Sequence, residues 1–315
     1  MPGPLTFPSL PIGLGLAALG RPSYLTIGHA TDVGNHPDRY ALGQQAARML
    51  DVAWDHGIRY FDVARSYGMA EEFLGDWLSR NHIDSADVVV SSKWGYTYTA
   101  AWRPNATVQE VKDHSSGVLR RQAAETRINL GGHLDLYQIH SATSDSGVLQ
   151  DAAVIDQLWE LRQRGVAVGL TTSGTAQGDT IKAALGVERG GELLFSAVQA
   201  TWNLLEPSAG GALGYAADAG LAVIVKEAVA NGRLTPRTDL LPAAHLGGFS
   251  ADAVAIAAAL AQPWCTTVLS GAATRDHLRS NLAALAVPPD VVEQLPDLSE
   301  SPAEYWATRA ALEWT

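Results

Sequence analysis

The stretch GIRYFDVARSYGMAEEFLG, residues 57–75, carries the pattern that decides the fold. A short β-type run, residues 58–61, ends in Asp62, and Tyr67 follows five residues later. A carboxylate buried at a strand end costs free energy unless a partner compensates it. A helical pattern, residues 71–81, comes next. A strand that leads through a polar turn into a helix is the repeating unit of α/β folds.

This unit recurs along the whole chain. We predict strands at residues 14–19, 60–64, 88–93, 135–140, 167–172, 196–201, 221–226 and 266–271. Helical patterns cover residues 41–57, 71–81, 108–132, 151–165, 250–263 and 274–285. Eight strand–helix units in about 300 residues predict an α/β fold, a (β/α)₈ TIM barrel that forms a single domain over residues 1–315.

A doubly wound open sheet is the structural alternative. Such sheets often bind dinucleotides through a GxGxxG turn, but residues 13–20, GLGLAALG, lack that spacing. Residues 5–10 precede the first predicted strand, and we expect a small hairpin there that closes the barrel floor.

Composition excludes several classes of function. The formal net charge is -11, which disfavours a nucleic-acid partner but leaves room for a local site that binds a phosphate-bearing cofactor. No apolar run reaches about 18 residues, so no membrane span is expected. The N-terminus lacks the basic region of a secretory signal, and the single cysteine, Cys265, fits a reducing compartment. These features predict a cytoplasmic protein.

One polar loop, residues 28–40, contains two histidines and two aspartates, namely His29, Asp32, His36 and Asp38. Their spacing fits no compact metal-ligand motif. We therefore expect a polar loop near the substrate and predict no metal site.

Ionisable residues stand where the predicted strands end, which is where (β/α)₈ barrels place their chemistry. Asp62 ends the second strand, Lys93 the third and His140 the fourth. Asp62 and Lys93 can form a buried ion pair, and an ammonium beside a phenol lowers the pKa of Tyr67. With His140 orienting a substrate oxygen, the set predicts a proton-transfer site for a carbonyl or hydroxyl group.

Aromatic residues near these strand ends have two interpretations. Trp94 and Tyr96 follow Lys93, and Trp306 lies in the aromatic C-terminal stretch. They either pack the loops or form a wall that binds a cyclic or sugar-like substrate.

The order Asp62, Tyr67, Lys93, His140 resembles the catalytic tetrad of the aldo-keto reductases. Residues 57–75 resemble that family's GIxxFDTAxxYGxxExxLG, and residues 135–140, DLYQIH, and 271–285 resemble two further segments. The resemblance implies NADPH, or less often NADH, and a small-molecule carbonyl or sugar substrate. It also implies that Tyr67 is the general acid, that Lys93 tunes it, that Asp62 holds Lys93, and that His140 orients the carbonyl.

Cofactor contacts are also implied by the resemblance. Gln199 matches the glutamine that binds the nicotinamide carboxamide, and Thr171 and Thr172 stand where the family usually has serine and asparagine. Where many members have an aromatic residue followed by serine, this chain has Lys226 and Glu227. Lys226 is expected to reach the pyrophosphate, and Glu227 to pair with a nearby base.

The late segment SGAATRDHLRSN, residues 270–281, is expected to bind the adenosine end. The amides of Gly271 and Ala272 would meet a phosphate at a helix N-terminus. Arg275 or His277 would bind a 2′-phosphate, and Asn281 would meet adenine. The arginine favours NADPH.

Two other functions are weighed against a reductase. The first is a nucleotide-binding regulatory or scaffold protein on the same barrel without turnover. The second is an unrelated barrel enzyme, a metal hydrolase or a Schiff-base lyase. Lys93 paired with Asp62 would stay charged and poorly nucleophilic, which disfavours the lyase.

Overall fold

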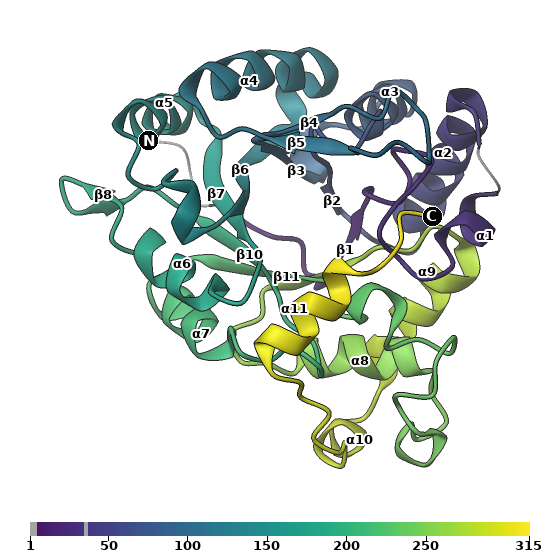
Figure 1. Cartoon of the computed structure of the whole chain (residues 1–315). Coiled ribbons are helices and arrows are strands. Elements are labelled where there is room, and N and C mark those ends of the chain that lie inside the picture. The colour runs from purple at the N-terminus through teal and green to yellow at the C-terminus, as the bar shows by residue number, and fades with distance from the viewer. Residues whose placement is uncertain (1–4, 35–36) are drawn as a thin grey trace.

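A computed structural model describes residues 5–34 and 37–315, in which eight parallel strands close into a barrel (Figure 1). His36 of the polar loop lies outside the described residues. The barrel strands are β1 (Ile12–Gly15), β2 (Tyr60–Asp62), β3 (Val89–Trp94), β6 (Leu134–Ala142), β7 (Ala167–Thr172), β10 (Ala197–Thr201), β11 (Ala222–Lys226) and β12 (Thr267–Ser270). Their order around the barrel follows the chain, so the predicted (β/α)₈ barrel is confirmed and the open sheet is excluded.

Helices alternate with the barrel strands and form the outer layer (Figure 1). They are α1 (His29–Val33), α2 (Arg39–Asp55), α3 (Ala70–Arg80), α4 (Ser116–Leu130), α5 (Ala152–Gln163), α6 (Gln177–Ala184), α7 (Gly210–Asp218), α8 (Ala251–Leu260), α9 (Arg275–Leu282), α10 (Pro289–Glu293) and α11 (Pro302–Ala310). Short 3₁₀ turns are η1 (Ser85–Asp87), η2 (Gly131–His133), η3 (Ser144–Ser146), η4 (Ala230–Gly232), η5 (Ala243–His245) and η6 (Ala283–Ala286). Within the described ranges, no helix combines the length and apolar character needed to cross a bilayer.

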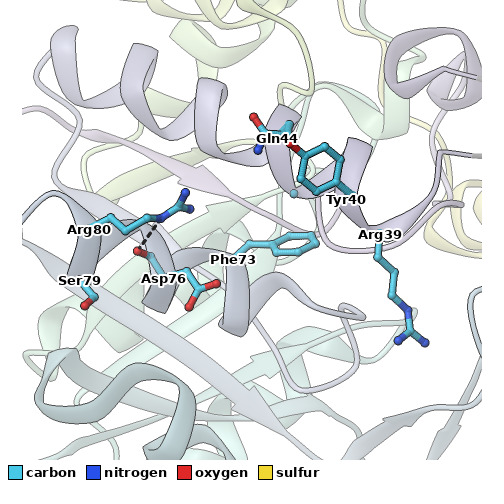
Figure 2. Close-up of a pocket in the computed structure, with 8 residues that line it drawn as sticks. Arg39, Tyr40, Gln44, Phe73, Asp76, Ser79 and Arg80 are labelled. Atoms are coloured by element: carbon cyan, nitrogen blue, oxygen red, sulfur yellow. Dashed lines mark hydrogen bonds between the residues drawn. The ribbon is translucent and has the colours of Figure 1, made fainter.

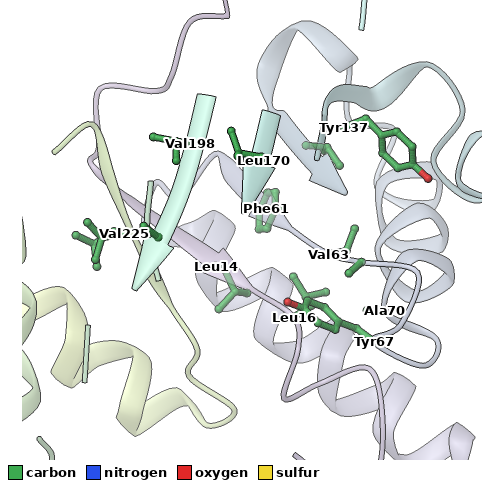
Figure 3. Close-up of a cluster of buried hydrophobic side chains, with 14 of the residues drawn as sticks. Leu14, Leu16, Phe61, Val63, Tyr67, Ala70, Tyr137, Leu170, Val198 and Val225 are labelled. Atoms are coloured by element: carbon green, nitrogen blue, oxygen red, sulfur yellow. The ribbon is translucent and has the colours of Figure 1, made fainter. Parts of the chain in front are cut away.

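Alternation along the strands separates the barrel interior from the helix layer. Tyr60, Leu136 and Ile224 pack together inside the barrel. Their neighbours Phe61 and Val225 belong to the large apolar cluster shared with the helices (Figure 3). Residues two positions beyond an inward residue therefore point to the interior at the C-terminal end of the strands.

The barrel floor is closed by the N-terminal segment, but not as a hairpin. Residues 5–10 form no strand, and Leu5 and Phe7 pack against the interior cluster. The ring centroid of Phe7 lies 4.9 Å from that of Tyr60 in an edge-to-face contact. The first strand also lies earlier than predicted: β1 ends at Gly15, and residues 17–20 turn away.

Two small antiparallel sheets were not predicted. β4 (Tyr96–Tyr98) pairs with β5 (Glu110–Lys112) after β3, and β8 (Glu188–Arg189) pairs with β9 (Glu192–Leu193) before β10. The second strand of the first sheet, β5, occupies residues that the sequence pattern assigned to a helix beginning at 108. That helix, α4, begins only at Ser116, after Ser115 caps it by accepting from the amide of Val118.

Candidate active site

Asp62 and Lys93 form the expected buried ion pair. They lie on the neighbouring strands β2 and β3, and Lys93 is 1% and Asp62 2% exposed. Lys93 Nζ donates to Asp62 Oδ2, and also to the carbonyl oxygen of Val63 at 3.0 Å. The pair satisfies both charges inside the barrel mouth, where either one alone would be costly.

The second carboxylate oxygen of Asp62 is held by neutral donors. Asp62 Oδ1 accepts from Ser91 Oγ at 2.6 Å, from Gln199 Nε2 at 3.2 Å and from Gln138 Nε2 at 3.4 Å. The amide nitrogen of Gln199 is thus engaged with Asp62. Its predicted contact with the nicotinamide carboxamide stays a prediction.

Tyr67 and His140 meet above this ion pair. The hydroxyl of Tyr67 lies 3.5 Å from His140 Nε2, and the two rings meet edge to face with centroids 5.4 Å apart. Lys93 Nζ lies 4.8 Å from the centroid of the Tyr67 ring. Figure 3 shows Tyr67 among the buried side chains around β1 and β2. The structure therefore brings all four predicted tetrad residues together, each at most 9% exposed.

The ionisation of these groups differs from the expectation for Tyr67. Burial, followed by the charge of Asp62, raises the pKa of Tyr67 well above its usual value of 10.0. The expected lowering by Lys93 is outweighed, because burial and the carboxylate of Asp62 act in the opposite direction. Burial and then Lys93 and Arg21 hold the pKa of His140 well below 6.5. Near neutral pH the site holds a protonated phenol and a neutral imidazole.

His140 sits at a distortion of β6 that side chains from other segments hold in place. The ladder with β7 shifts register between Ile139 and Ala142, and Ser141 has a φ of 52°. The His140 carbonyl accepts from His114 Nε2 at 2.8 Å, and the Ser141 amide donates to Thr171 Oγ1 at 2.7 Å. A contact from beyond β5 therefore fixes the backbone of a predicted catalytic residue.

Lys226 and Glu227 meet a base that the sequence did not reveal. Arg309 of α11 donates to Glu227 with Nη2–Oε1 at 2.5 Å and Nε–Oε2 at 2.9 Å. Lys226 Nζ donates to Thr201 Oγ1 at 2.7 Å and lies 3.8 Å from Glu227. This confirms that Glu227 pairs with a base, and it fastens α11 across the barrel mouth (Figure 1). No local pattern links residues that are 82 positions apart.

Lys226, Glu227 and Arg309 carry two positive charges and one negative charge. Burial would raise the pKa of Glu227, but Arg309 and Lys226 lower it to about 2. Burial lowers the pKa of Lys226 to about 8. Because Arg309 holds Glu227 by the closer contacts, the charge of Lys226 is only partly compensated.

We predict that Glu227 makes the fold sensitive to acid. Its carboxylate stabilises the folded state above its ordinary pKa of 4.5, and this contribution is lost as the pH falls toward 2. Glu227→Gln should therefore flatten the fall in unfolding free energy between about pH 5 and 2 by roughly 3 kcal/mol. Urea unfolding at a series of pH values measures this, with Glu160→Gln on an exposed pair as the control. Equal slopes in wild type and Glu227→Gln contradict the prediction.

Thr171 and Thr172 end β7, as predicted, and both are fully buried. Thr171 Oγ1 is used by the Ser141 amide. Thr172 Oγ1 has no hydrogen-bond partner among the described residues. Its hydroxyl is therefore available to a bound polar group, while that of Thr171 already supports β6.

The late segment agrees only in part with the expected adenosine site. The amide of Ala272 already donates to Ser270 Oγ at 3.3 Å, whereas Gly271 and Arg275 are exposed. His277 is half-buried, with Nδ1 3.8 Å from Asp32 Oδ2.

Asn281 is held inside the late segment, and its predicted contact with adenine stays a prediction. It is 6% exposed, and in the orientation that satisfies its neighbours its amide nitrogen donates to Asp252 Oδ2 at 2.8 Å. Its amide oxygen then accepts from Ser270 Oγ. Both ends of the side chain tie α9 to α8 and β12, because the residue faces the inner side of its helix.

The predicted aromatic wall is corrected at one position. Trp94 is 0% exposed and belongs to the main apolar cluster, because it follows the inward-facing Lys93 and points to the helix layer. Tyr96 lies at the mouth, with its ring centroid 5.0 Å from that of His140. Trp306 is half-buried, and its ring centroid lies 6.0 Å from Lys226 Nζ. Tyr96 and Trp306 thus lie beside His140 and Lys226, and their contact with a substrate stays a prediction.

Arg21 and Glu110 at the mouth were missed by the sequence reasoning. Arg21 lies in the loop after β1 and is 2% exposed, and its Nη1 lies 2.8 Å from Glu110 Oε2. A basic residue two positions after the end of the first predicted strand was the available signal. Glu110, its partner, lies on β5, a strand that was not predicted, and the sequence held no signal for it.

A surface hollow of about 410 Å³ lies elsewhere, between α2 and α3 (Figure 2). Its lining residues are Arg39, Tyr40, Gly43, Gln44, Phe73, Asp76, Ser79 and Arg80. None of these belongs to the predicted site. Among the described residues, no group of three or more histidines, cysteines or carboxylates is placed to hold a metal ion.

Comparison with known proteins gives a consistent result. The profile of the aldo/keto reductase family matches residues 11–300. The uncharacterized oxidoreductase YrpG of Bacillus subtilis (strain 168) is 25% identical over 303 residues, which cover 82% of this chain and 87% of that protein. D-threo-aldose 1-dehydrogenase of a Pseudomonas species is 31% identical over 176 residues, half of each chain.

A solved structure has the same fold. Aldo-keto reductase AKR11C1 from Bacillus halodurans, in its holo form, matches with a TM-score of 0.70 over 92% of each chain. The two sequences are 20% identical, so this likeness concerns the architecture alone.

Proposed function

Because this chain belongs to the aldo/keto reductase family and is an oxidoreductase, we propose that it reduces an aldehyde or ketone with NADPH. The same site would oxidise the matching alcohol or sugar in reverse. The observation that carries the proposal is the contact set of Asp62, Tyr67, Lys93 and His140.

The residues at the mouth fit a dinucleotide. Lys226 supplies a partly compensated cation for an anionic pyrophosphate. Thr172 supplies a buried hydroxyl that lacks a partner among the described residues and suits a carboxamide. When bound, a reduced nicotinamide supplies hydride to the carbonyl carbon.

The chain's own residues would handle the proton and the orientation of the substrate. Tyr67 is protonated at neutral pH and donates to the carbonyl oxygen as negative charge develops there. Nε2 of neutral His140 lies 3.5 Å from the Tyr67 hydroxyl and would orient the carbonyl oxygen of the substrate. Lys93, fixed by Asp62, keeps a positive charge against the Tyr67 ring and stabilises the phenolate that remains.

The proposal is tested by titrating the protein with NADPH and NADH, using nucleotide fluorescence. Turnover is then followed by nicotinamide absorbance with aldehydes, ketones and aldoses, since one relative is named an aldose dehydrogenase. Binding with turnover supports the reductase. Nucleotide binding without turnover on any class favours the regulatory alternative, and binding of neither nucleotide overturns the proposal.

Cofactor choice gives a separate prediction. Arg275 is exposed at the start of α9, where its guanidinium would pair with a 2′-phosphate. Arg275→Gln should weaken NADPH binding about tenfold and leave NADH binding unchanged, because only NADPH carries that charge. Isothermal titration of both nucleotides measures the ratio, with Arg279→Gln in the last turn of α9 as the matched control. An unchanged ratio would assign the 2′-phosphate contact to another residue.

A further inference from the structure

Arg21 is a buried guanidinium next to the predicted proton donor. Arg21 lies in the loop after β1. Its Nη1 donates to the carbonyl oxygen of Ser66 at 3.1 Å and to Glu110 Oε2 at 2.8 Å. Ser66 directly precedes Tyr67, so this contact fixes the loop that carries the phenol. The donor thus comes from the loop after β1 and its counter-charge from β5.

Three aromatic rings enclose the guanidinium. Its central carbon lies 5.5 Å from the ring centroid of Tyr67, 5.3 Å from that of Tyr24 and 4.6 Å from that of Trp314. A cation over an aromatic face is attracted by the ring, and more strongly where water is excluded. Arg21 therefore packs directly against Tyr67.

We propose that Arg21 and Glu110 form a charge pair that positions Tyr67 and sets how readily its hydroxyl releases a proton. This inference rests on the proposed role of Tyr67. It goes beyond the tetrad, because neither residue belongs to it, and both act through Tyr67.

Titratable side chains from six segments face Tyr67, namely those of Arg21, Asp62, Lys93, Glu110, His140 and Glu227. Burial and the carboxylates of Asp62, Glu110 and Glu227 raise the pKa of Tyr67, and Arg21 lowers it. Lys93 is held by Asp62 in an ion pair, and His140 is uncharged near neutral pH. The balance between Arg21 and Glu110 is therefore a local control of the phenol.

Glu110 makes the pair adjustable. It is 21% exposed, whereas Arg21 is 2% exposed, so neutralising the carboxylate costs little at Glu110 itself but leaves the buried guanidinium without its counter-charge. Arg21 without Glu110 keeps its bond to Ser66 and its three ring contacts. Removing each charge separately is therefore a fair comparison.

The test uses Arg21→Met, Glu110→Gln and the conservative Arg21→Lys. Two readouts are taken: the alkaline limb of the kcat/KM profile, and the titration of Tyr67 by NMR of the tyrosine ring carbon that bears the hydroxyl. Tyr67→Phe identifies the signal. Arg21→Met should move the limb and the titration to higher pH by about one pH unit, because a nearby cation is lost.

Glu110→Gln should move both readouts in the opposite direction, because a nearby anion is lost. Arg21→Lys should restore the wild-type position. Opposite shifts support the pair. If Arg21→Met and Glu110→Gln only lower stability or kcat at every pH, with neither readout displaced, the inference is overturned. Glu110→Gln decides the question even if Arg21→Met fails to fold.

The two readouts separate this inference from the proposed function. If the protein turns over no carbonyl, the proposed function fails, while the NMR titration still shows whether Arg21 and Glu110 control the phenol. If turnover depends on Tyr67 but neither variant displaces its titration, only the charge pair is wrong.

Discussion

Tyr67→Phe is expected to lower kcat for carbonyl reduction about 10³-fold, because the change removes the hydroxyl whose proton would be transferred to the carbonyl oxygen. The ring keeps its packing against the main apolar cluster and against Arg21. Nucleotide affinity and the free energy of unfolding should therefore stay close to wild type. Steady-state kinetics with a fluorescence titration measures both quantities on one preparation.

A matched control for Tyr67→Phe is Tyr96→Phe. Tyr96 also contacts the His140 ring, but it is only half-buried and lacks the contact with Lys93. Its loss of kcat should be less than about tenfold. Full turnover in Tyr67→Phe would assign the proton to another donor and end the tetrad interpretation.

Lys93→Met should produce the largest loss of stability of any single change at the site. It leaves Asp62 charged inside the barrel, where the loss of a buried partner costs about 3–5 kcal/mol. The double variant Asp62→Asn/Lys93→Met keeps an oxygen for Ser91 and Gln199 and removes both charges. It should therefore lose much less stability.

Urea unfolding followed by circular dichroism compares the two proteins. A single variant as stable as the double one would mean that water or a structural shift compensates Asp62, contrary to its 2% exposure. Activity should be abolished in both, since the phenolate loses its neighbouring cation.

Barrel architecture was predictable because most of the barrel strands end in a recognisable change of pattern. The tetrad was predictable for the same reason: alternation carries Asp62, Lys93 and His140 inward beyond the apolar floor. The displaced β1 shows where this reasoning fails, since residues 14–19 are apolar throughout and no polar residue marks the end of the strand.

Charge pairs with a partner outside the barrel strands were not predictable. Arg309 meets Glu227 through a helix that follows the barrel, and Glu110 meets Arg21 through β5, a strand that lies inside a predicted helical pattern. The raised pKa of Tyr67 depends on the same unknowns, because burial and the carboxylate of Asp62 decide its direction. Trp94 was misplaced for a simpler reason: its type and position did not reveal which side of the strand it faces.

The β4–β5 hairpin shares no hydrogen-bond ladder with the barrel. It nevertheless brings Tyr96 and Glu110 to the mouth, and His114 follows it directly. Gly95 begins the excursion with a φ of 109°, where a Cβ would lie 2.2 Å from the His114 ring. Residues 95–114 therefore form a segment that could be exchanged as a unit. Such an exchange would change the charge beside Tyr67 and the contact that holds the backbone of His140, and it would leave the eight hydrogen-bonded strand pairs of the barrel intact.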